Sequence, residues 1–294
     1  MQNQHITQVF NQVDSLPSLP ATVSRVISVT ADPESSANDL MEAILPDQSM
    51  CATILKIANS AFFGMPREVA TIDKAVTVLG FNEVHNIVLG KAVFNSFQKI
   101  GPGSKEIVQD FWNHSFSCAL TAKILAEDLG CSPSELFIAG LIHDIGKLVI
   151  LMALPGEYLP ILELTGMQQN QCHQVESKTF EISHEQVGFR LLTRWLFPER
   201  LINSVGFHHH PQNDGPHSLY ALIVQLSDTL SILLHEKELS ANTTLFSRVC
   251  TLLPEGQALW KQHNLSIEEE QVEGWMEKLQ ISLEKDGGIL QMLS

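Results

Sequence analysis

The run LFIAGLIHDIGKLVILMAL occupies residues 136–154 and carries His143, Asp144 and Lys147 at the centre of an otherwise apolar stretch. Its length is close to that of a membrane-spanning helix. However, ionisable side chains at the centre of a bilayer are costly. A helix that is apolar all round is also typical of the core of a large soluble domain. We therefore interpret the run as a buried helix and expect no membrane partner.

The adjacent pair His143 and Asp144 needs a partner inside such a core. Neighbouring positions of a helix point about 100° apart, so both side chains cannot share one solvent-facing side. A buried carboxylate is costly unless it is paired or coordinates a metal. A divalent cation would offset that cost for both side chains. An ion pair between Asp144 and Lys147, three residues on, is the alternative, and the residues alone leave both interpretations open.

The composition limits the classes of partner. The chain has 294 residues and a net charge of −15, because 33 acidic residues outnumber 18 basic ones. A surface this acidic repels phosphate backbones and anionic lipids, so we expect no nucleic-acid partner and no membrane docking. The five cysteines have no zinc-finger or CxxC spacing, which favours free thiols in a reducing compartment. The first residues lack the pattern of a signal peptide, and we expect a cytoplasmic protein.

The pattern along the chain predicts an all-α fold. Apolar residues recur at helical spacing, for example in Leu19–Ser28 and Leu120–Leu129, and no run alternates strictly as a strand would. The Gly-Pro-Gly within residues 99–105 interrupts the helices, and a weaker break falls at residues 237–244. We therefore expect an N-terminal helical lobe at residues 1–100, a second lobe at 101–240, and accessory helices at 241–294.

Eight of the twelve histidines fall between residues 114 and 217, and histidine is the commonest metal ligand. His114 follows Asp110 by one helical turn, which makes Asp110 a candidate additional ligand or outer partner. A partly buried histidine beside Trp112 is the alternative for His114. His184 follows Ser183, a good N-cap, and near a helix start the neutral imidazole that binds metals is favoured. A surface histidine at a helix start is its alternative.

Two further positions complete the candidates. His208, His209 and His210 precede Pro211, which ends a helix, so a solvated helix terminus is the alternative to a ligand role there. Asp228 lies in the apolar segment SLYALIVQLSDTLSILL, where an exposed polar stripe is the alternative to a ligand.

In chain order these residues form a recognisable series. They are His114, His143, Asp144, His184, His208, His209 and Asp228. The series resembles that of the HD superfamily of metal-dependent phosphohydrolases, in the version associated with two-metal sites. The surrounding phrases resemble the HDOD family over roughly residues 10–235. They are LPSLP (16–20), IANSAFFG (57–64) and AVTVLG (75–80) in the first lobe, and FWNHS, AGLIHDIGK, SHEQVGFRLLTRWLFP and FHHHP in the second.

The resemblance implies a fold, a ligand set and a setting. The fold is an HD-domain/PDEase-like helical fold with an N-terminal helical lobe. The seven residues of the series are the implied metal ligands, and His210 fits the pattern less well. Lys147 is the implied catalytic residue near a substrate phosphate. The mixed imidazole and carboxylate shell suits one or two divalent transition-metal ions, Fe, Mn, Zn or Ni. The implied setting is bacterial signal transduction with a signalling protein as partner.

Whether the site is catalytic is left open at this point. The family implies a signalling module with no established general activity. The alternatives are a metal-dependent phosphohydrolase, acting on a phosphodiester, a nucleotide or another phosphorylated small molecule, and a di-iron oxygenase of HD type. Related HD-GYP phosphodiesterases carry an acidic, glycine-rich stretch ending in Gly-Tyr-Pro after the histidine pair. Here PQNDGPH follows at residues 211–217, so cyclic-di-GMP hydrolysis by that route is not expected.

Overall fold

The regular secondary structure of the described residues is entirely helical. The computed structural model describes residues 2–60, 68–97, 100, 104–165, 171–213, 218–234 and 244–286. Every regular element within these ranges is a helix, and none is a strand. The predicted all-α fold class is therefore confirmed.

The chain divides into two compact units. The larger combines Met1–Leu16 with Ile100–Gln280, and the smaller combines Pro17–Lys99 with Ile281–Ser294. The first helix thus groups with the later part of the chain, although the sequence analysis placed it in the N-terminal lobe. The division into folding domains at residues 100 and 240 stays a prediction.

The smaller unit is a cluster of short amphipathic helices. They are α2 (Ala21–Ala31), α3 (Ala37–Ile44), α4 (Gln48–Ala58), α5 (Ile72–Leu79) and α6 (Phe81–Ser96). Ser36 begins α3 with a capping box, since its side chain accepts from the Asp39 backbone N–H and the Asp39 carboxylate accepts in return. Apolar side chains such as Val23, Leu40 and Ile54 are fully buried. Most of the break predicted at residues 99–105 and half of the IANSAFFG phrase lie outside the described residues.

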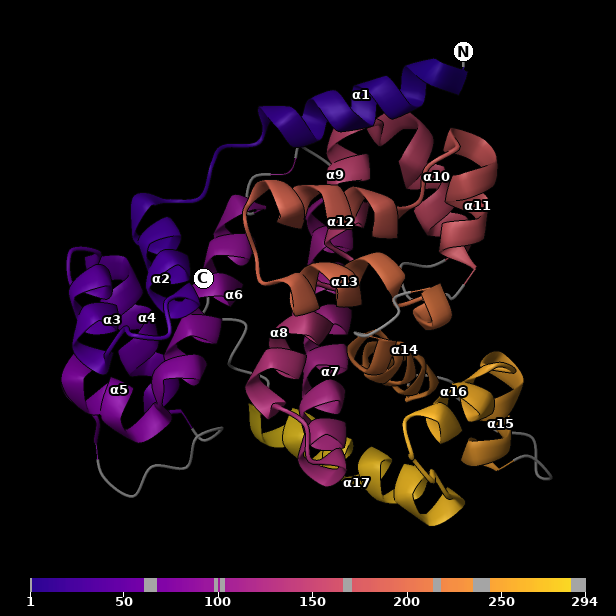
Figure 1. Cartoon of the computed structure of the whole chain (residues 1–294). Helices are drawn as coiled ribbons and strands as arrows, with labels where there is room; N and C mark the ends of the chain where they lie inside the picture. The colour runs from indigo at the N-terminus through magenta and orange to yellow at the C-terminus, as the bar shows by residue number, and fades with distance from the viewer. Residues whose placement is uncertain are drawn as a thin grey trace. The chain divides into compact units, whose positions relative to one another are not determined.

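The larger unit contains the remaining helices, except that the residues of α17 from Ile281 on group with the smaller unit (Figure 1). They are α1 (Gln2–Ser15), α7 (Lys105–Leu129), α8 (Pro133–Ile142), α9 (Ile145–Ala153), α10 (Pro155–Thr165), α11 (Cys172–Phe180), α12 (His184–Arg194), α13 (Glu199–Phe207), the 3-10 turn η1 (Pro211–Asn213), α14 (Ser218–Leu233), α15 (Leu245–Leu252), α16 (Gly256–Gln262) and α17 (Glu269–Asp286). The long helix α7 packs against α8 and α14, while α12 packs against α9 and α13. Helix α1 lies across α9 and α12.

The apolar run at residues 136–154 is buried, but it is not one helix. Helix α8 ends at Ile142 and α9 begins at Ile145, so His143 and Asp144 form the junction between them. The expectation of a continuous helix through the pair is wrong. Among the described residues, Pro133–Ala153 is the one stretch long and apolar enough to cross a membrane, and most of it is buried inside the fold. That burial is typical of a core segment.

Two glycines let the helices beside this junction approach their neighbours closely. A Cβ on Gly140 would lie 2.8 Å from the Ala119 Cα in α7. A Cβ on Gly146 would lie 1.9 Å from the backbone carbonyl oxygen of His184 in α12. Only glycine fits where two backbones come this close. The junction is therefore held against the two helices that carry His114 and His184.

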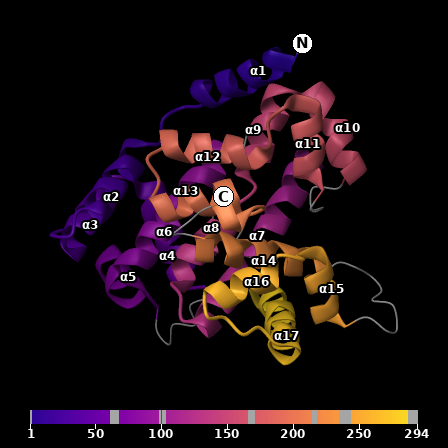
Figure 2. The same ribbon diagram turned by 45° about the vertical axis from the view of Figure 1, so that its right-hand side comes forward.

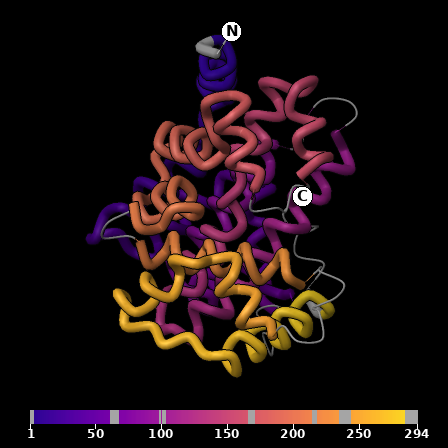
Figure 3. The backbone as a smooth tube through the Cα atoms, turned by 90° about the vertical axis from the view of Figure 1, so that its right-hand side faces the viewer, coloured from indigo at the N-terminus to yellow at the C-terminus, as the bar shows by residue number. Residues whose placement is uncertain are grey.

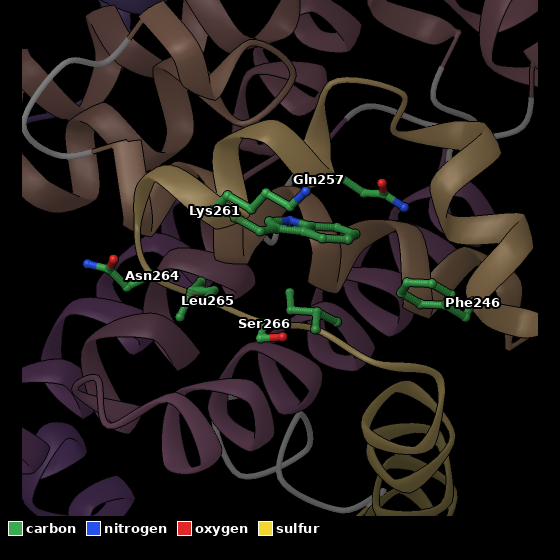
Figure 4. Close-up of a pocket in the computed structure, with 8 residues that line it drawn as sticks. Phe246, Gln257, Lys261, Asn264, Leu265 and Ser266 are labelled. Carbon is green, nitrogen blue, oxygen red and sulfur yellow. The ribbon is translucent and has the colours of Figure 1, made fainter.

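Helices α15 and α16 pack beside α14 at one end of the larger unit, and α17 contacts α7 (Figures 2 and 3). Trp275 in α17 is 2% exposed, and its indole N–H donates to the Asp128 carboxylate of α7 at 3.2 Å. A pocket of about 450 Å³ opens between these helices, with Phe246, Trp260 and Lys261 in its lining (Figure 4). None of its lining residues belongs to the predicted ligand series.

Candidate metal centre

The structure brings the seven predicted ligands together from five places in the larger unit. His114 comes from α7, His143 and Asp144 from the α8–α9 junction, His184 from the start of α12, His208 and His209 from the residues after α13, and Asp228 from α14. They form two groups, in each of which the ligand atoms lie within 4.8 Å of one another. The first is Asp144, His184, His208 and His209. The second is His114, His143 and Asp228.

Local sequence signals position several of these side chains. Ser183 and Gln186 form a capping box that fixes the start of α12, as the N-cap prediction required, and His184 is its first residue. Helix α13 ends at Phe207, so His208 and His209 lie in the turn before Pro211. That turn directs both imidazoles inward: His208 is fully buried and His209 is half-buried. A solvated helix terminus is thus excluded for this pair.

The Asp144 carboxylate faces both groups. Its Oδ1 lies 3.0 Å from His184 Nε2 and 3.7 Å from His208 Nε2. Its Oδ2 lies 3.3 Å from His143 Nε2 and 2.5 Å from the Lys147 ammonium. The two interpretations of this carboxylate are therefore not exclusive, because it forms the ion pair with Lys147 and also lies among the imidazoles.

Asp228 occupies the matching position in the second group. Its Oδ1 lies 2.9 Å from His114 Nε2 and 3.7 Å from His143 Nε2. Asp228 is 6% exposed and His114 is 2% exposed. The exposed polar stripe considered for Asp228 is excluded by this burial.

Several buried atoms of the cluster lack hydrogen-bond partners. They are Nδ1 and Nε2 of His114, Nε2 of His143, Oδ1 of Asp144 and Nε2 of His208. Buried polar atoms are nearly always hydrogen bonded, and here imidazole nitrogens lie near carboxylate oxygens without hydrogen-bond geometry. Nitrogen and oxygen atoms gathered in this way match the ligand shell of a transition-metal ion. The residues present therefore fit a bound metal.

The outer nitrogens of three rings are held by acceptors. His143 Nδ1 donates to the Gly140 carbonyl oxygen at 2.8 Å, and His208 Nδ1 donates to the Val205 carbonyl oxygen at 2.8 Å. His184 Nδ1 contacts Oε2 of Glu176 at 2.7 Å. Because these oxygens can only accept, each ring carries a proton on Nδ1, and Nε2 is the nitrogen that would face a metal.

Burial and charged neighbours shift the pKa values of several side chains in the cluster. Burial opposes ionisation of Asp144, but His143, Lys147 and His184 outweigh it and hold its pKa well below the usual value. Burial likewise opposes a charged His184, yet Glu176 and Asp144 raise its pKa to about 9. For His209, burial together with His208 and His184 holds the pKa well below the usual value. Metal binding at His184 would displace the proton on Nε2.

Some expectations for neighbouring residues need correction. Asp110 is exposed and belongs to neither ligand group, so its expected role as an extra ligand or outer partner is wrong. The helical spacing places it on the side of His114, but the Asp110 side chain is exposed while the neighbouring Phe111 and Trp112 are buried. His210 is exposed and outside both groups, while His217 lies outside the described residues. The catalytic role of Lys147 stays a prediction.

Two residues near the site were not anticipated. His173 stacks on His209 with ring centroids 4.1 Å apart and an interplanar angle of 20°. Glu176 is fully buried against His184. Both lie in α11, whose buried residues Cys172, Glu176 and Phe180 recur at a spacing of four. The apolar Cys172 and Phe180 on this face are a weak signal for the burial of Glu176. No such signal marks His173, whose contact with His209 comes from tertiary packing.

A helical unit with this ordered histidine and aspartate cluster defines an HD-type protein. The HDOD domain model matches residues 16–211. The chain belongs to the HDOD family.

Solved structures share the fold across almost the whole chain. An HDOD domain protein of unknown function from Geobacter sulfurreducens is 24% identical, with a TM-score of 0.72 and coverage of 99% of this chain and 98% of that one. A protein from Shewanella amazonensis, provisionally named a phosphohydrolase, is 24% identical, with a TM-score of 0.75 and coverage of 98% of both chains.

Sequence relatives are longer proteins. An uncharacterized protein from Treponema pallidum is 25% identical over 204 residues, which is 69% of this chain and 39% of that protein. Ribonuclease Y from Thermus thermophilus is 29% identical over 123 residues, which is 42% of this chain and 16% of that enzyme. The chain therefore matches less than half of the length of these relatives.

Proposed function

We propose that this chain is a signal-transduction HDOD module that acts through a protein partner and holds two transition-metal ions in its larger unit. The observation that carries the proposal is the meeting of the two ligand groups at Asp144, whose two oxygens face different imidazoles. A carboxylate with one oxygen toward each group is suited to bridge two ions. A Marinobacter aquaeolei protein of similar fold, provisionally named a signal transduction protein, supports the setting.

The ligands divide unequally between the two ions. Asp144, His184, His208 and His209 would hold one ion, and His114, His143 and Asp228 would hold the other. Three or four nitrogen and oxygen ligands suit Fe, Mn, Zn or Ni. Six of the seven ligands are buried and His209 is half-buried, so His209 marks the side from which a small molecule would approach.

A second candidate function is hydrolysis of a phosphoester at the same centre. Lys147 favours it, because its ammonium lies 2.5 Å from Asp144 Oδ2 and would neutralise charge on a phosphate beside the metals. Bound metal ions would supply Lewis-acid activation of the phosphoester and of the attacking water. The relatives named ribonuclease Y favour a phosphodiester as the first substrate class to test. The net charge of −15 favours a small phosphodiester over a polynucleotide.

Metal analysis tests the first proposal. Wild-type chain purified without chelator, or loaded with Mn or Fe, should contain two ions per chain by elemental analysis. The double variant His143→Ala with Asp144→Ala should contain none. The matched control is Asp110→Asn, which removes an exposed carboxylate one turn from His114 and should keep both ions. A wild-type chain that stays metal-free after loading would contradict the proposal.

A chromogenic phosphodiester tests the second candidate. Mn-loaded wild type should hydrolyse bis(p-nitrophenyl) phosphate, and Lys147→Met should lower the rate while keeping the bound metal. Hydrolysis that survives the double variant cannot come from this centre. Oxygen uptake by the iron-loaded chain without hydrolysis would instead favour the di-iron oxygenase.

A further inference from the structure

Glu176 is a fully buried carboxylate whose hydrogen-bond capacity is taken up on both sides. Its Oε2 accepts from His184 Nδ1 at 2.7 Å and from the His184 backbone N–H at 2.8 Å. Its Oε1 accepts from the Tyr158 hydroxyl and from the Cys172 thiol, the latter at 3.3 Å. Glu176 of α11 thus accepts hydrogen bonds from both the backbone and the ring of His184, the first residue of α12.

We infer that Glu176 is a positioning residue of the metal centre. It fixes the His184 ring with Nδ1 protonated and Nε2 directed at Asp144, and its charge strengthens His184 as a ligand. The inference rests on the proposed metal-binding function.

The acceptor of the Nδ1–H hydrogen bond differs between His184 and two other rings of the cluster. His143 and His208 donate from Nδ1 to neutral backbone carbonyls of the preceding helical turn. His184 is the first residue of its helix and has no preceding turn to supply such a carbonyl. A side chain from another helix provides the acceptor, and it is an anion. A carboxylate behind an imidazole raises the basicity of the ring toward a metal.

The other partners of Glu176 support this role. Tyr158 is fully buried and Cys172 is 1% exposed, and both hydrogen bond to Oε1, the oxygen that does not contact His184. Neutral hydroxyl and thiol donors stabilise the carboxylate without neutralising its charge. That charge is therefore directed at His184, and through it at the ligand group around Asp144.

The test uses two readouts on the full chain. In the metal-free chain, the His184 Nδ1–H bound to a carboxylate should give a downfield proton resonance that exchanges slowly, assigned by ¹⁵N-histidine labelling and its loss in His184→Ala. In the zinc-loaded chain, competition with a chromophoric chelator measures affinity. Glu176→Gln keeps the shape and removes the charge, while Glu176→Ala removes the acceptor. Tyr158→Phe is the matched control, because it removes a buried donor to Glu176 and leaves the contact with His184.

The expected results are specific. Glu176→Gln should shift the resonance upfield and lower zinc affinity about 10-fold to 100-fold. Glu176→Ala should abolish the resonance. Tyr158→Phe should keep the resonance, with zinc affinity within about twofold of wild type. Circular dichroism identifies variants that fail to fold. The zinc affinity of folded Glu176→Gln decides whether Glu176 positions His184.

Two outcomes separate the inference from the proposed function. If wild type binds zinc and a folded Glu176→Gln chain binds it equally well, the inference is overturned while the metal centre stands. If wild type binds no metal, the proposed function fails. The resonance then still decides whether Glu176 holds the ring, since its absence in wild type would overturn that contact.

Discussion

At the scale of single residues, Asp144 has the Lys147 ammonium 2.5 Å from one oxygen and the His184 imidazole 3.0 Å from the other. Lys147 is 3% exposed, so its charge depends on this carboxylate for stabilisation. The carboxylate in turn depends on nearby cations, because burial otherwise disfavours its charged form. Bound metal ions would therefore stabilise the same carboxylate as Lys147, and loss of one would increase the dependence on the other.

Lys147→Met is expected to destabilise the metal-free chain by about 3 kcal/mol, since it leaves a buried carboxylate without its ammonium partner. Zinc should restore part of this loss, because cations then compensate the Asp144 charge. Urea unfolding with EDTA and with zinc measures both values. Lys74→Met removes an exposed lysine of α5 and should change stability by less than about 0.5 kcal/mol. A metal-free Lys147→Met chain as stable as wild type would show that the ion pair does not stabilise the fold.

The sequence order identified all seven clustered residues, but it did not identify their surroundings. Glu176 and His173 were not predicted, because their contacts with His184 and His209 depend on how α11 packs against other parts of the fold. Asp110 was wrongly predicted to take part. The spacing of four residues sets the direction of a side chain around a helix, but it does not say how far along α7 the neighbouring helices extend.

At the scale of helices, the site depends on the contact between α9 and α12 at Gly146. Gly146→Ala would place a Cβ 1.9 Å from the His184 carbonyl oxygen and 2.9 Å from the Gly188 backbone nitrogen. Neither backbone atom can move without shifting α12. We expect a loss of about 2–3 kcal/mol of stability, together with weaker zinc binding, because His184 would move away from Asp144.

Chemical denaturation and zinc competition check this pair of effects. Gly156→Ala is the control, since a Cβ there meets nothing within 4 Å and should change stability by less than about 0.5 kcal/mol. Gly146→Ala with wild-type stability and zinc affinity would mean that the two helices are not held this closely.

The turn after α12 contains a local strain that can be relieved. Leu196 has φ of +58°, a conformation that costs about 1 kcal/mol in residues other than glycine and asparagine, and it is 76% exposed. Leu196→Asn should therefore stabilise the chain by about 1 kcal/mol, because little apolar burial is lost. Thermal or urea unfolding measures the gain.

A second exposed leucine provides the comparison. Leu164 is 80% exposed and lies within α10. Leu164→Asn should lose about 0.5 kcal/mol through helix propensity. If both variants shift stability in the same direction, the effect at Leu196 comes from surface polarity and not from backbone strain.

Helix positions were predictable from the sequence to different degrees. The starts of α3 and α12 follow from Ser36 and Ser183, whose capping boxes are local interactions. The break at His143 and Asp144 was missed, because the flanking residues Leu136–Ile142 and Ile145–Leu154 are apolar apart from Lys147 and contain no proline. The two helices that meet at this turn pack closely on different partners, α8 on Ala119 at Gly140 and α9 on His184 at Gly146.

At the scale of the whole molecule, the fold class followed from periodicity, but the grouping of helices did not. Helix α1 joins the larger unit through contacts with α9 and α12, more than a hundred residues away. For example, the Arg194 guanidinium donates to the Asp14 carbonyl oxygen at 3.1 Å. Contacts of this separation leave no periodic signal in the sequence, because helical spacing reports only which face of a helix is buried.

The grouping of the ligands in one unit predicts which helices lose stability when metal is removed. All seven candidate ligands lie in the larger unit. A metal at about 100 times its dissociation constant stabilises the state that binds it by about 2.7 kcal/mol. If the two units open independently, zinc should slow amide hydrogen exchange in α7, α9, α12 and α14 and leave α3 and α5 unchanged. Exchange measured by mass spectrometry with zinc and with EDTA gives this map, with the double variant at His143 and Asp144 as the control. Equal slowing of exchange in α3 and α5 would contradict independent opening of the two units. The free energy of metal binding would then stabilise the whole chain as one cooperative structure.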